Sequence, residues 1–437
     1  MTRMGWLLVL GVALAARLAL WLNLASQPRF LLRPDSPGYL QPAQNLVRHG
    51  VYSASESPPW LPDAAHPPGY PAFLAAHLLV SESLLAPAAS QVILDAGTAA
   101  LVSVAAASLS SHPAAWLVGL LYALDPVALA HSPLILSEAL CTFLLTLALL
   151  LLLRAGAEPT RGVLVACAGL CLGAATSVRP VLLYLWLPWS LALLWAYPGR
   201  RKRFAGYFAA GALLLIGAWC LRNRAIWGDF RYNPVRSDYT LLWEAAAVQS
   251  AVDRQPVEAA RQKLYEEVHR RQALRGVDEI AGTRVAQEVA LEVLRAHPWP
   301  ALRLFPVSMV KMFWGPGLDV VAEVLWPGAS FVRTESAVAS LAGRGTLSML
   351  KERPCLWLAL AWGLLVLTLL YGLAALGLWR VWQGRQRFAA AACLVPVVYL
   401  ALISSGGWVY YRHRILILPL LAVFGAIALG KPAPHDR

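Results

Sequence analysis

The chain is a succession of apolar runs separated by short polar segments. Each run is close to the roughly 20 residues that a helix needs to cross the hydrocarbon core of a bilayer. We therefore predict an all-α, polytopic membrane protein with about ten transmembrane helices. The predicted spans are residues 5–25, 88–110, 114–131, 133–153, 162–178, 181–197, 204–221, 355–379, 388–404 and 415–429.

Two of the apolar runs need separate interpretation. The first, 5–25, resembles a signal peptide in position, but it is long for one and no clear small-x-small cleavage site follows before Gln27. We interpret it as a membrane anchor. Residues 70–85 form a shorter run that contains His77. This length predicts an interfacial or re-entrant helix instead of a full span.

Composition and charge agree with a membrane protein. Hydrophobic residues make up 58% of the chain and charged residues 14%, whereas soluble domains hold about one half and one quarter. The formal net charge of +13 would suit a nucleic-acid binder. The basic residues, however, cluster at the ends of apolar runs, as at 200–203 and 380–387, which is typical of cytoplasmic ends of spans. We expect the partner to be the lipid bilayer, with both chain ends cytoplasmic, and no nucleic acid.

The spacing of the runs divides the chain into three parts. The middle part has no uninterrupted run of membrane length, but it shows the apolar periodicity of helices over 249–295. We predict an external, periplasmic helical region whose apolar tail, 299–314, forms helices at the membrane surface. The parts are 1–222 as an N-terminal transmembrane module with a first outer loop at 26–87, 223–353 as the external region, and 354–437 as the C-terminal transmembrane helices.

Polar residues concentrate in the first outer loop. Asp35 stands between Pro34 and Pro37, which restrict its backbone. A positioned carboxylate is what a general base requires, although an aspartate in a proline-rich loop is more often a turn or cap residue. A helix that Ser36 caps and Gly50 ends is compatible with either role.

Other charged residues stand at the outer ends of predicted spans. Glu138 opens one span, and an ionisable group near a membrane segment is costly and is usually functional or paired. Arg179, Arg412 and Arg414 lie at junctions. Such arginines either snorkel to the interface or bind a phosphate through their fork of donors.

Two further acidic residues have structural interpretations. Asp95 lies inside a span and is either a functional group or a structural hydrogen-bond partner. Asp125 precedes Pro126 near the outer surface, where it can serve as a helix cap.

The sequence contains no signature of a soluble nucleotide-dependent enzyme. There is no Gly-x-Gly-x-x-Gly after a strand, no phosphate loop and no His-Glu-x-x-His. Without a nucleotide-binding fold, an activated donor has to come from the lipid phase. This pattern favours a lipid-linked phosphate as the substrate.

Five short motifs occur in an order that resembles a known family. They are Asp35-Ser36-x-x-Tyr39, His66-Pro67-Pro68-Gly69-Tyr70-Pro71, Ser137-Glu138, Arg179-Pro180 and Arg412-x-Arg414. The arrangement resembles the GT-C type glycosyltransferases, such as protein O-mannosyltransferases and bacterial lipid A aminoarabinose transferases. These polytopic membrane enzymes take a sugar from a polyprenyl-phosphate carrier. The resemblance implies a GT-C fold with its catalytic centre in the first outer loop.

The resemblance also implies roles for individual residues. Asp35 would be the catalytic base that deprotonates the acceptor, which attacks the anomeric carbon with inversion and expels polyprenyl phosphate. Glu138 would position the acceptor or a divalent cation, and no other cofactor is implied. The residues expected to bind substrate are Arg33, Tyr39, His66, Tyr70, Arg179, Arg412 and Arg414.

The sequence departs from the family pattern at two positions. Ser36 stands where the family often has a second acid beside the aspartate, so a metal site using that acid is disfavoured, and we assign no metal ligand. His66 stands where several relatives carry a basic group on the donor phosphate. Because an unperturbed histidine titrates near about 6.5, we expect that charge assistance to depend on pH.

Other functions are compatible with the same residues. They include a transporter or flippase of lipid-linked sugars, a non-catalytic carrier-lipid-binding protein and a membrane polymerase of surface polysaccharide. Transporters usually show internal repeats with broken helices at the midplane, whereas the polar groups here gather at one face. We expect a glycosyltransferase of the bacterial inner membrane, with its site facing the periplasm or exterior and a protein, lipid or glycan acceptor.

Overall fold

The computed structural model describes residues 3–157, 162–196, 201–276, 279–328, 349–382, 386–406 and 411–430. Within these ranges the protein is helical, and the β-structure consists of an isolated bridge between Ser53 and Pro62. In chain order the elements are α1 (Arg3–Ala25), η1 (Pro28–Leu31), α2 (Ser36–His49), α3 (Gly69–Leu78), α4 (Leu85–Ala106), α5 (His112–Ala123), α6 (Pro126–His131), α7 (Glu138–Ala157), α8 (Gly162–Val178), η2 (Pro180–Leu182), α9 (Trp186–Ala196), α10 (Arg201–Trp227), α11 (Pro234–Asp253), α12 (Val257–Arg275), α13 (Glu279–Ala296), α14 (Pro298–Trp314), α15 (Leu318–Leu325), α18 (Leu356–Trp382), α19 (Arg387–Ser404), η3 (Tyr411–Leu416) and α20 (Leu418–Leu429).

The apolar helices make this a multi-pass membrane protein. Among the described residues, six helices are long and apolar enough to cross a membrane, namely those in α1, α4, α7, α10, α18 and α19. Shorter apolar helices cover Gly162–Val178, Pro180–Trp195 and Leu418–Leu429. These segments match the predicted all-α polytopic class.

One predicted span is interrupted. Residues 114–131 were expected to form a single helix, but α5 ends at Ala123 and α6 begins at Pro126. The carboxylate of Asp125 accepts hydrogen bonds from the amides of Val127 and Ala128, so it caps α6 as the sequence suggested. Because proline has no amide hydrogen and favours the first turn of a helix, Pro126 starts a new helix at this point.

The start of the first outer-loop helix also differs from expectation. Ser36 was expected to cap α2, but it is the first residue of the helix, and its hydroxyl donates to the carbonyl of Ile135 at 2.7 Å. This contact fastens the loop to the segment before α7. At the other end, Gly50 has a left-handed φ of 68°, as expected for a glycine that ends a helix.

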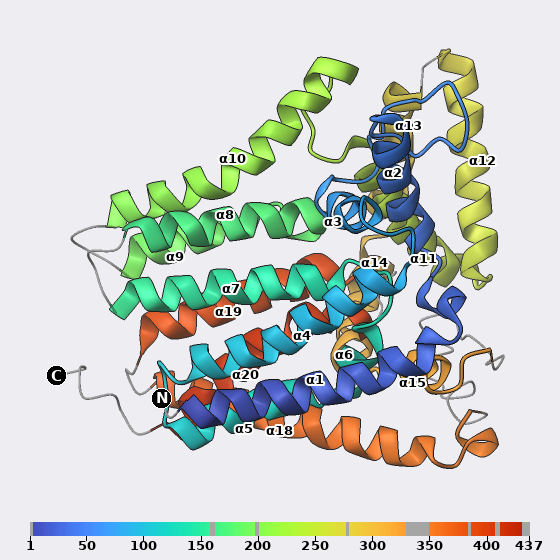
Figure 1. Cartoon of the computed structure of the whole chain (residues 1–437). Coiled ribbons are helices and arrows are strands. Elements are labelled where there is room, and N and C mark those ends of the chain that lie inside the picture. Colours follow the sequence, from blue (N-terminus) through green and yellow to red (C-terminus); the bar gives the residue numbers. More distant parts are fainter. Residues whose placement is uncertain are drawn as a thin grey trace.

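The membrane helices lie side by side, and the remaining helices gather at one end of the bundle. Figure 1 shows α2, α3, α6 and α11 to α15 at that end, while α1 starts at the opposite end. The expected interfacial helix is α3, which is short and is followed by the membrane helix α4. The predicted cytoplasmic clusters include Arg200 and Arg385, which lie outside the described residues.

Small residues allow α8 and α10 to approach closely. A Cβ atom added at Gly169 would lie 2.1 Å from the carbonyl oxygen of Phe208, and one at Gly211 would lie 2.4 Å from that of Ala166. In a membrane, where lipid is as apolar as a leucine side chain, close backbone packing is a main source of helix association. These glycines therefore hold α10 on the bundle.

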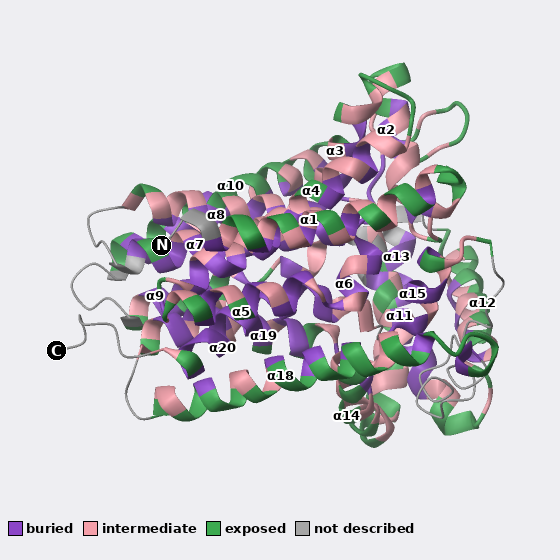
Figure 2. Ribbon diagram, turned by 60° about the horizontal axis from the view of Figure 1, so that its bottom comes forward, coloured by how far each residue is buried: buried purple, intermediate pink, exposed green. Residues whose placement is uncertain are grey.

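Buried residues face the centre of the bundle and exposed apolar residues face outward (Figure 2). Leu214 on α10 and Leu358 on α18 are 63% and 76% exposed. Such exposure of large apolar side chains suits contact with lipid acyl chains.

The middle of the chain forms a separate helical layer at the end of the bundle. Helices α11, α12 and α13 share their own apolar core, which includes Leu242, Val268 and Val289.

The tail expected to consist of several helices is one continuous helix, α14, which passes through Pro306. The expected boundary at residue 222 falls inside α10, which continues to Trp227.

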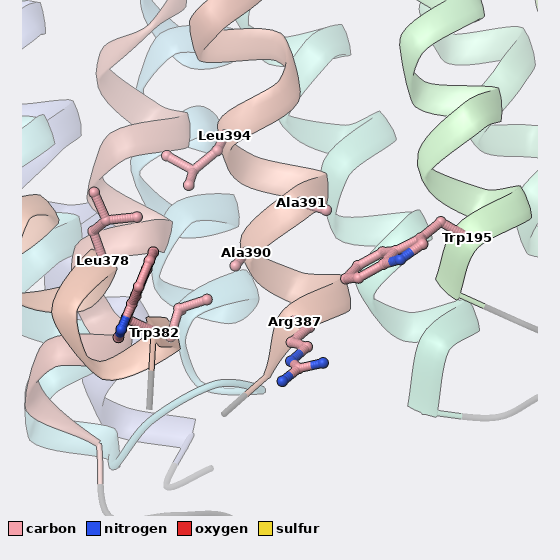
Figure 3. Close-up of a pocket in the computed structure, with 8 residues that line it drawn as sticks. Trp195, Leu378, Trp382, Arg387, Ala390, Ala391 and Leu394 are labelled. Carbon is pink, nitrogen blue, oxygen red and sulfur yellow. The ribbon is translucent and has the colours of Figure 1, made fainter. Parts of the chain in front are cut away.

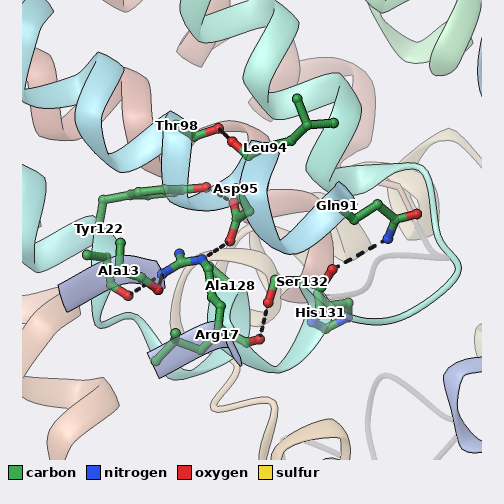
Figure 4. Close-up of polar contacts among 12 residues, drawn as sticks. Ala13, Arg17, Gln91, Leu94, Asp95, Thr98, Tyr122, Ala128, His131 and Ser132 are labelled. Carbon is green, nitrogen blue, oxygen red and sulfur yellow. Dashed lines mark hydrogen bonds and ion pairs between the residues drawn. The ribbon is translucent and has the colours of Figure 1, made fainter. Parts of the chain in front are cut away.

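A buried ion pair and its hydrogen bonds join α1, α4 and α5. The guanidinium of Arg17 on α1 contacts the carboxylate of Asp95 on α4 at 2.6 Å, and the hydroxyl of Tyr122 on α5 donates to the same carboxylate (Figure 4). Arg17 also donates to the carbonyl of Ala123 at 2.9 Å. Asp95 is therefore a structural partner, because charges removed from water require both pairing and hydrogen bonds.

We predict that Asp95→Asn destabilises the protein by about 3–5 kcal/mol, because it leaves the charge of Arg17 buried without its counter-ion. The measurement is the melting temperature of the detergent-solubilised protein. A variant with Arg17→Met, Asp95→Leu and Tyr122→Phe removes all the polar groups together and is expected to recover most of the loss. A melting temperature of Asp95→Asn equal to that of the wild type would contradict the role given to the pair.

Candidate active site

Charged residues from four distant segments meet where the outer loop joins the bundle. Asp35 precedes α2, Glu138 begins α7, Arg179 follows α8, and Arg412 lies in η3. The guanidinium of Arg412 contacts the carboxylate of Asp35 at 2.6 Å, and its Nε lies 3.8 Å from Glu138. Arg179 contacts Glu138 at 2.7 Å. Arg412 therefore lies between the two acids that the sequence singled out.

The two acids differ in their access to solvent. The Glu138 side chain is 2% exposed, whereas the Asp35 side chain is 30% exposed. Arg179 also donates to the hydroxyl of Ser137 at 3.1 Å, which fixes its direction toward Glu138. Glu138 is thus placed to hold the arginines, while Asp35 is the carboxylate that a dissolved or membrane-borne substrate can reach.

The electrostatics of the site keep Arg412 charged. Burial on its own lowers the pKa of Arg412, but the carboxylates of Glu138 and Asp35 outweigh burial and raise this pKa above its ordinary value. The guanidinium therefore stays charged, and a planar fork of donors is the group by which arginine binds phosphates. Asp35 retains a cation next to it whatever the pH.

A histidine that the sequence analysis did not select lies in the same cluster. Burial, and then the positive charges of Arg179 and Arg412, lower the pKa of His413 to about 3. The imidazole is therefore neutral at physiological pH. Its position between Arg412 and Arg414 in the sequence was visible, but the shift depends on burial and on Arg179, which only the fold supplies.

The aromatic and basic residues of the first outer loop pack against one another. The ring of Tyr39 meets those of His66 and Tyr70 edge-on, with centroids 5.6 Å and 5.1 Å away. The Nδ1 of His66 lies 3.0 Å from the carboxylate of Asp63, a buried partner that sequence reasoning missed. The sequence does contain a hint of this pair, because Asp63 lies three residues before His66. A Cβ added at Gly38 would lie 2.7 Å from His66, so glycine permits this packing.

The structure directs two of the expected substrate-binding arginines elsewhere. Arg33 forms an ion pair with Glu323 on α15. Arg414 is buried and donates to the carbonyl of Gly315. Because a 3₁₀ helix has about three residues per turn, side chains two residues apart point to different sides, so Arg412 and Arg414 do not converge.

Helix α15 contacts two segments of the charged cluster, one just before Asp35 and one just before Arg412. Glu323 pairs with Arg33, which lies two residues before Asp35. One turn earlier, the carboxylate of Asp319 accepts a hydrogen bond from Tyr411 at 2.6 Å, directly before Arg412. Helix α15 therefore fixes the segments that carry Asp35 and Arg412.

The donor set does not match a divalent-cation site. Among the described residues, no group of three or more His, Cys, Asp or Glu side chains is arranged to hold a metal ion. The carboxylates of Asp35 and Glu138 are instead each next to a guanidinium. Since these positive charges oppose a cation between the acids, we derive no step through a metal.

Comparison with solved structures defines the class of fold. No family model matches the sequence, and no curated protein sequence matches it. The archaeal oligosaccharyltransferase AglB from Archaeoglobus fulgidus, in complex with an inhibitory peptide and a dolichol-phosphate, is similar with a TM-score of 0.55 and 14% identity, covering 98% of this chain and 50% of that one. The apo form of the Archaeoglobus fulgidus oligosaccharyltransferase gives a TM-score of 0.52 and 15% identity, with the same coverage.

The chain therefore has the GT-C fold, as the sequence motifs implied. It spans half the length of the solved structures that it matches. Within the described residues the bundle is helical and carries α2, α3 and the layer of α11 to α13 at one end.

We predict that Glu138→Gln destabilises the protein more than Asp35→Asn does. Removing Glu138 leaves the charges of Arg179 and Arg412 buried without their shared carboxylate, a loss of about 3–5 kcal/mol. Asp35 is partly exposed, so its ion pair contributes about 1 kcal/mol or less. Melting temperatures in one detergent compare the two variants, and equal values would contradict a structural role for Glu138.

Proposed function

We propose that this protein is a membrane glycosyltransferase that moves a sugar from a polyprenyl-phosphate carrier to an acceptor. The observation that carries the proposal is the pairing of a partly exposed Asp35 with Arg412 on a GT-C fold, beside the buried Glu138. A base and a phosphate-binding cation are the groups that such a transfer needs next to each other. In the proposed mechanism, Asp35 and Glu138 belong to the catalytic centre.

In the proposed reaction, Asp35 takes the proton of the acceptor nucleophile. The nucleophile forms a bond to the anomeric carbon from the face opposite the phosphate, and the bond from that carbon to the phosphate oxygen breaks. The configuration is inverted, and polyprenyl phosphate leaves with the electron pair. Preorganised cations at Arg412 and Arg179 stabilise the charge that develops on the phosphate. When the phosphate binds Arg412, it competes with Asp35 for the guanidinium and frees the carboxylate to act as a base.

A structural neighbour supports a lipid-linked donor. The AglB structure contains a dolichol-phosphate, which is a phosphate on a polyprenyl-type chain, together with an inhibitory peptide. A donor of this type places its phosphate at the membrane surface and its chain among the helices. In the proposed site, Tyr39 and His66 lie on the loop side of the charged cluster, with His66 oriented by Asp63 and with the buried Tyr70 packed against Tyr39.

We propose that the site faces the periplasm or exterior of a bacterial inner membrane. Basic residues lie at the end of the bundle away from the site, such as Arg154 in the last turn of α7 and Arg380 in the last turn of α18. The positive-inside rule assigns such ends to the cytoplasm. The three-part division is retained in this proposal, with the external region over the outer face.

We predict that Asp35→Asn lowers the rate of sugar transfer by about 10²–10⁴-fold, because it removes the base and keeps its size. Carrier binding is expected to persist, since Arg412 and Arg179 are unchanged. The assay uses purified protein in lipid with a panel of radiolabelled polyprenyl-phosphate sugars and peptide, lipid and glycan acceptors. It follows loss of sugar from the carrier and binding of the carrier separately.

Asp253→Asn is the matched control for this change. Asp253 is an exposed aspartate at the end of α11, where it accepts a hydrogen bond from Gln255. The Asp253→Asn variant is expected to transfer sugar at the wild-type rate. If Asp35→Asn also transfers at that rate, Asp35 is not the base. Carrier binding without transfer by the wild type would identify a non-catalytic carrier-lipid-binding protein, and movement of the donor across vesicles would identify a transporter.

A further inference from the structure

An apolar groove opens at the end of the bundle away from the candidate active site. It has a volume of about 490 Å³ and lies between the last turns of α9 and α18 and the start of α19 (Figure 3). Its lining is Trp195, Leu378, Val381, Trp382, Arg387, Ala390, Ala391 and Leu394. Arg387 is the charged member of this lining, and within the described residues the lining supplies no acid.

The groove has the features of the boundary between a membrane and water. Trp195 and Trp382 are 59% and 89% exposed and lie on opposite sides of Arg387 in Figure 3. Tryptophan is enriched at this boundary because its ring is apolar and its N–H is polar. Deeper in the groove, the alanines of α19 leave room beside Leu378 and Leu394. The groove thus combines an apolar wall with a cation at its mouth.

Arg387 is placed where a bound anion would be favoured. It is the first residue of α19, and the dipole of a helix disfavours a cation at that end. Nearby Arg380 instead donates to the carbonyl of Gly430 at 2.6 Å, so its guanidinium is engaged by the protein. An anion at the groove mouth would be attracted by the guanidinium of Arg387 and would also offset its position in the helix dipole.

We propose that this groove binds an anionic phospholipid from the leaflet opposite the candidate active site. The phosphate of the headgroup pairs with Arg387, the indoles of Trp195 and Trp382 flank the glycerol region, and an acyl chain follows Leu378 and Leu394. Charge complementarity selects an acidic lipid, and the apolar wall selects an acyl chain. The lipid joins α9, α18 and α19 at the end where α19 returns into the membrane. This site is separate from the proposed transfer reaction and does not depend on it.

The test uses the full chain in nanodiscs that contain a small fraction of photoactivatable phosphatidylglycerol or phosphatidylcholine with the same acyl chains. After illumination, mass spectrometry quantifies lipid attached to the peptide that contains Leu394. Phosphatidylglycerol is expected to label this peptide about fivefold more than phosphatidylcholine does, since one basic residue near the headgroup region favours an acidic lipid by about that factor. Arg387→Gln is expected to remove the preference while the melting temperature stays at the wild-type value.

Arg154→Gln is the matched control, because Arg154 is an exposed arginine in the last turn of α7 at the same end of the bundle. It is expected to keep the preference for phosphatidylglycerol. Equal labelling by the two lipids in the wild type, or an unchanged preference in Arg387→Gln, would overturn the proposal. So would displacement of the label by an equimolar amount of polyprenyl phosphate, since that result would assign the groove to the carrier.

Discussion

The buried carboxylate of Glu138 imposes the constraint on which the arrangement of the site depends. A charge inside a membrane protein is stable only when it is paired, and Glu138 lies against Arg179 and near Arg412. These partners come from the end of α8 and from η3, so the start of α7 has to meet both segments at one end of the bundle. Arg412 then contacts Asp35 and joins the first outer loop to the same point. The proposed catalytic base is positioned by an ion-pair network that spans most of the chain.

The middle region of the chain contributes to this arrangement through α15. Helix α15 contacts Arg33 through Glu323 and Tyr411 through Asp319. These residues lie directly before the segments that carry Asp35 and Arg412, so a shift of α15 would move both groups of the proposed site. The region between the membrane helices therefore acts as a positioning element for the charges, although its sequence shows only the periodicity of surface helices.

Much of the fold was predictable because the requirements of a bilayer are local. A span needs an apolar run of a given length, and the polar backbone inside lipid has to be helical, so the runs predicted the membrane helices. Predictions failed where a single side-chain contact decided the outcome. Asp125 and Pro126 divide the expected span 114–131 because the cap and the missing amide start a new helix. Ser36 contacts the carbonyl of Ile135 instead of capping α2, a choice that depends on a neighbour far away in the sequence.

The sequence by itself determined the class of protein, the positions of most membrane helices and the residue types available for chemistry. Only the tertiary structure decided which of those residues meet. It brought Arg412 to Asp35 across a separation of 377 residues, added His413 to the cluster, and directed Arg33 and Arg414 to other partners. The pattern of apolar residues along a segment indicates whether lipid, water or protein surrounds it. The partner of a charged side chain depends instead on how distant segments pack, and no local sequence pattern predicts that packing.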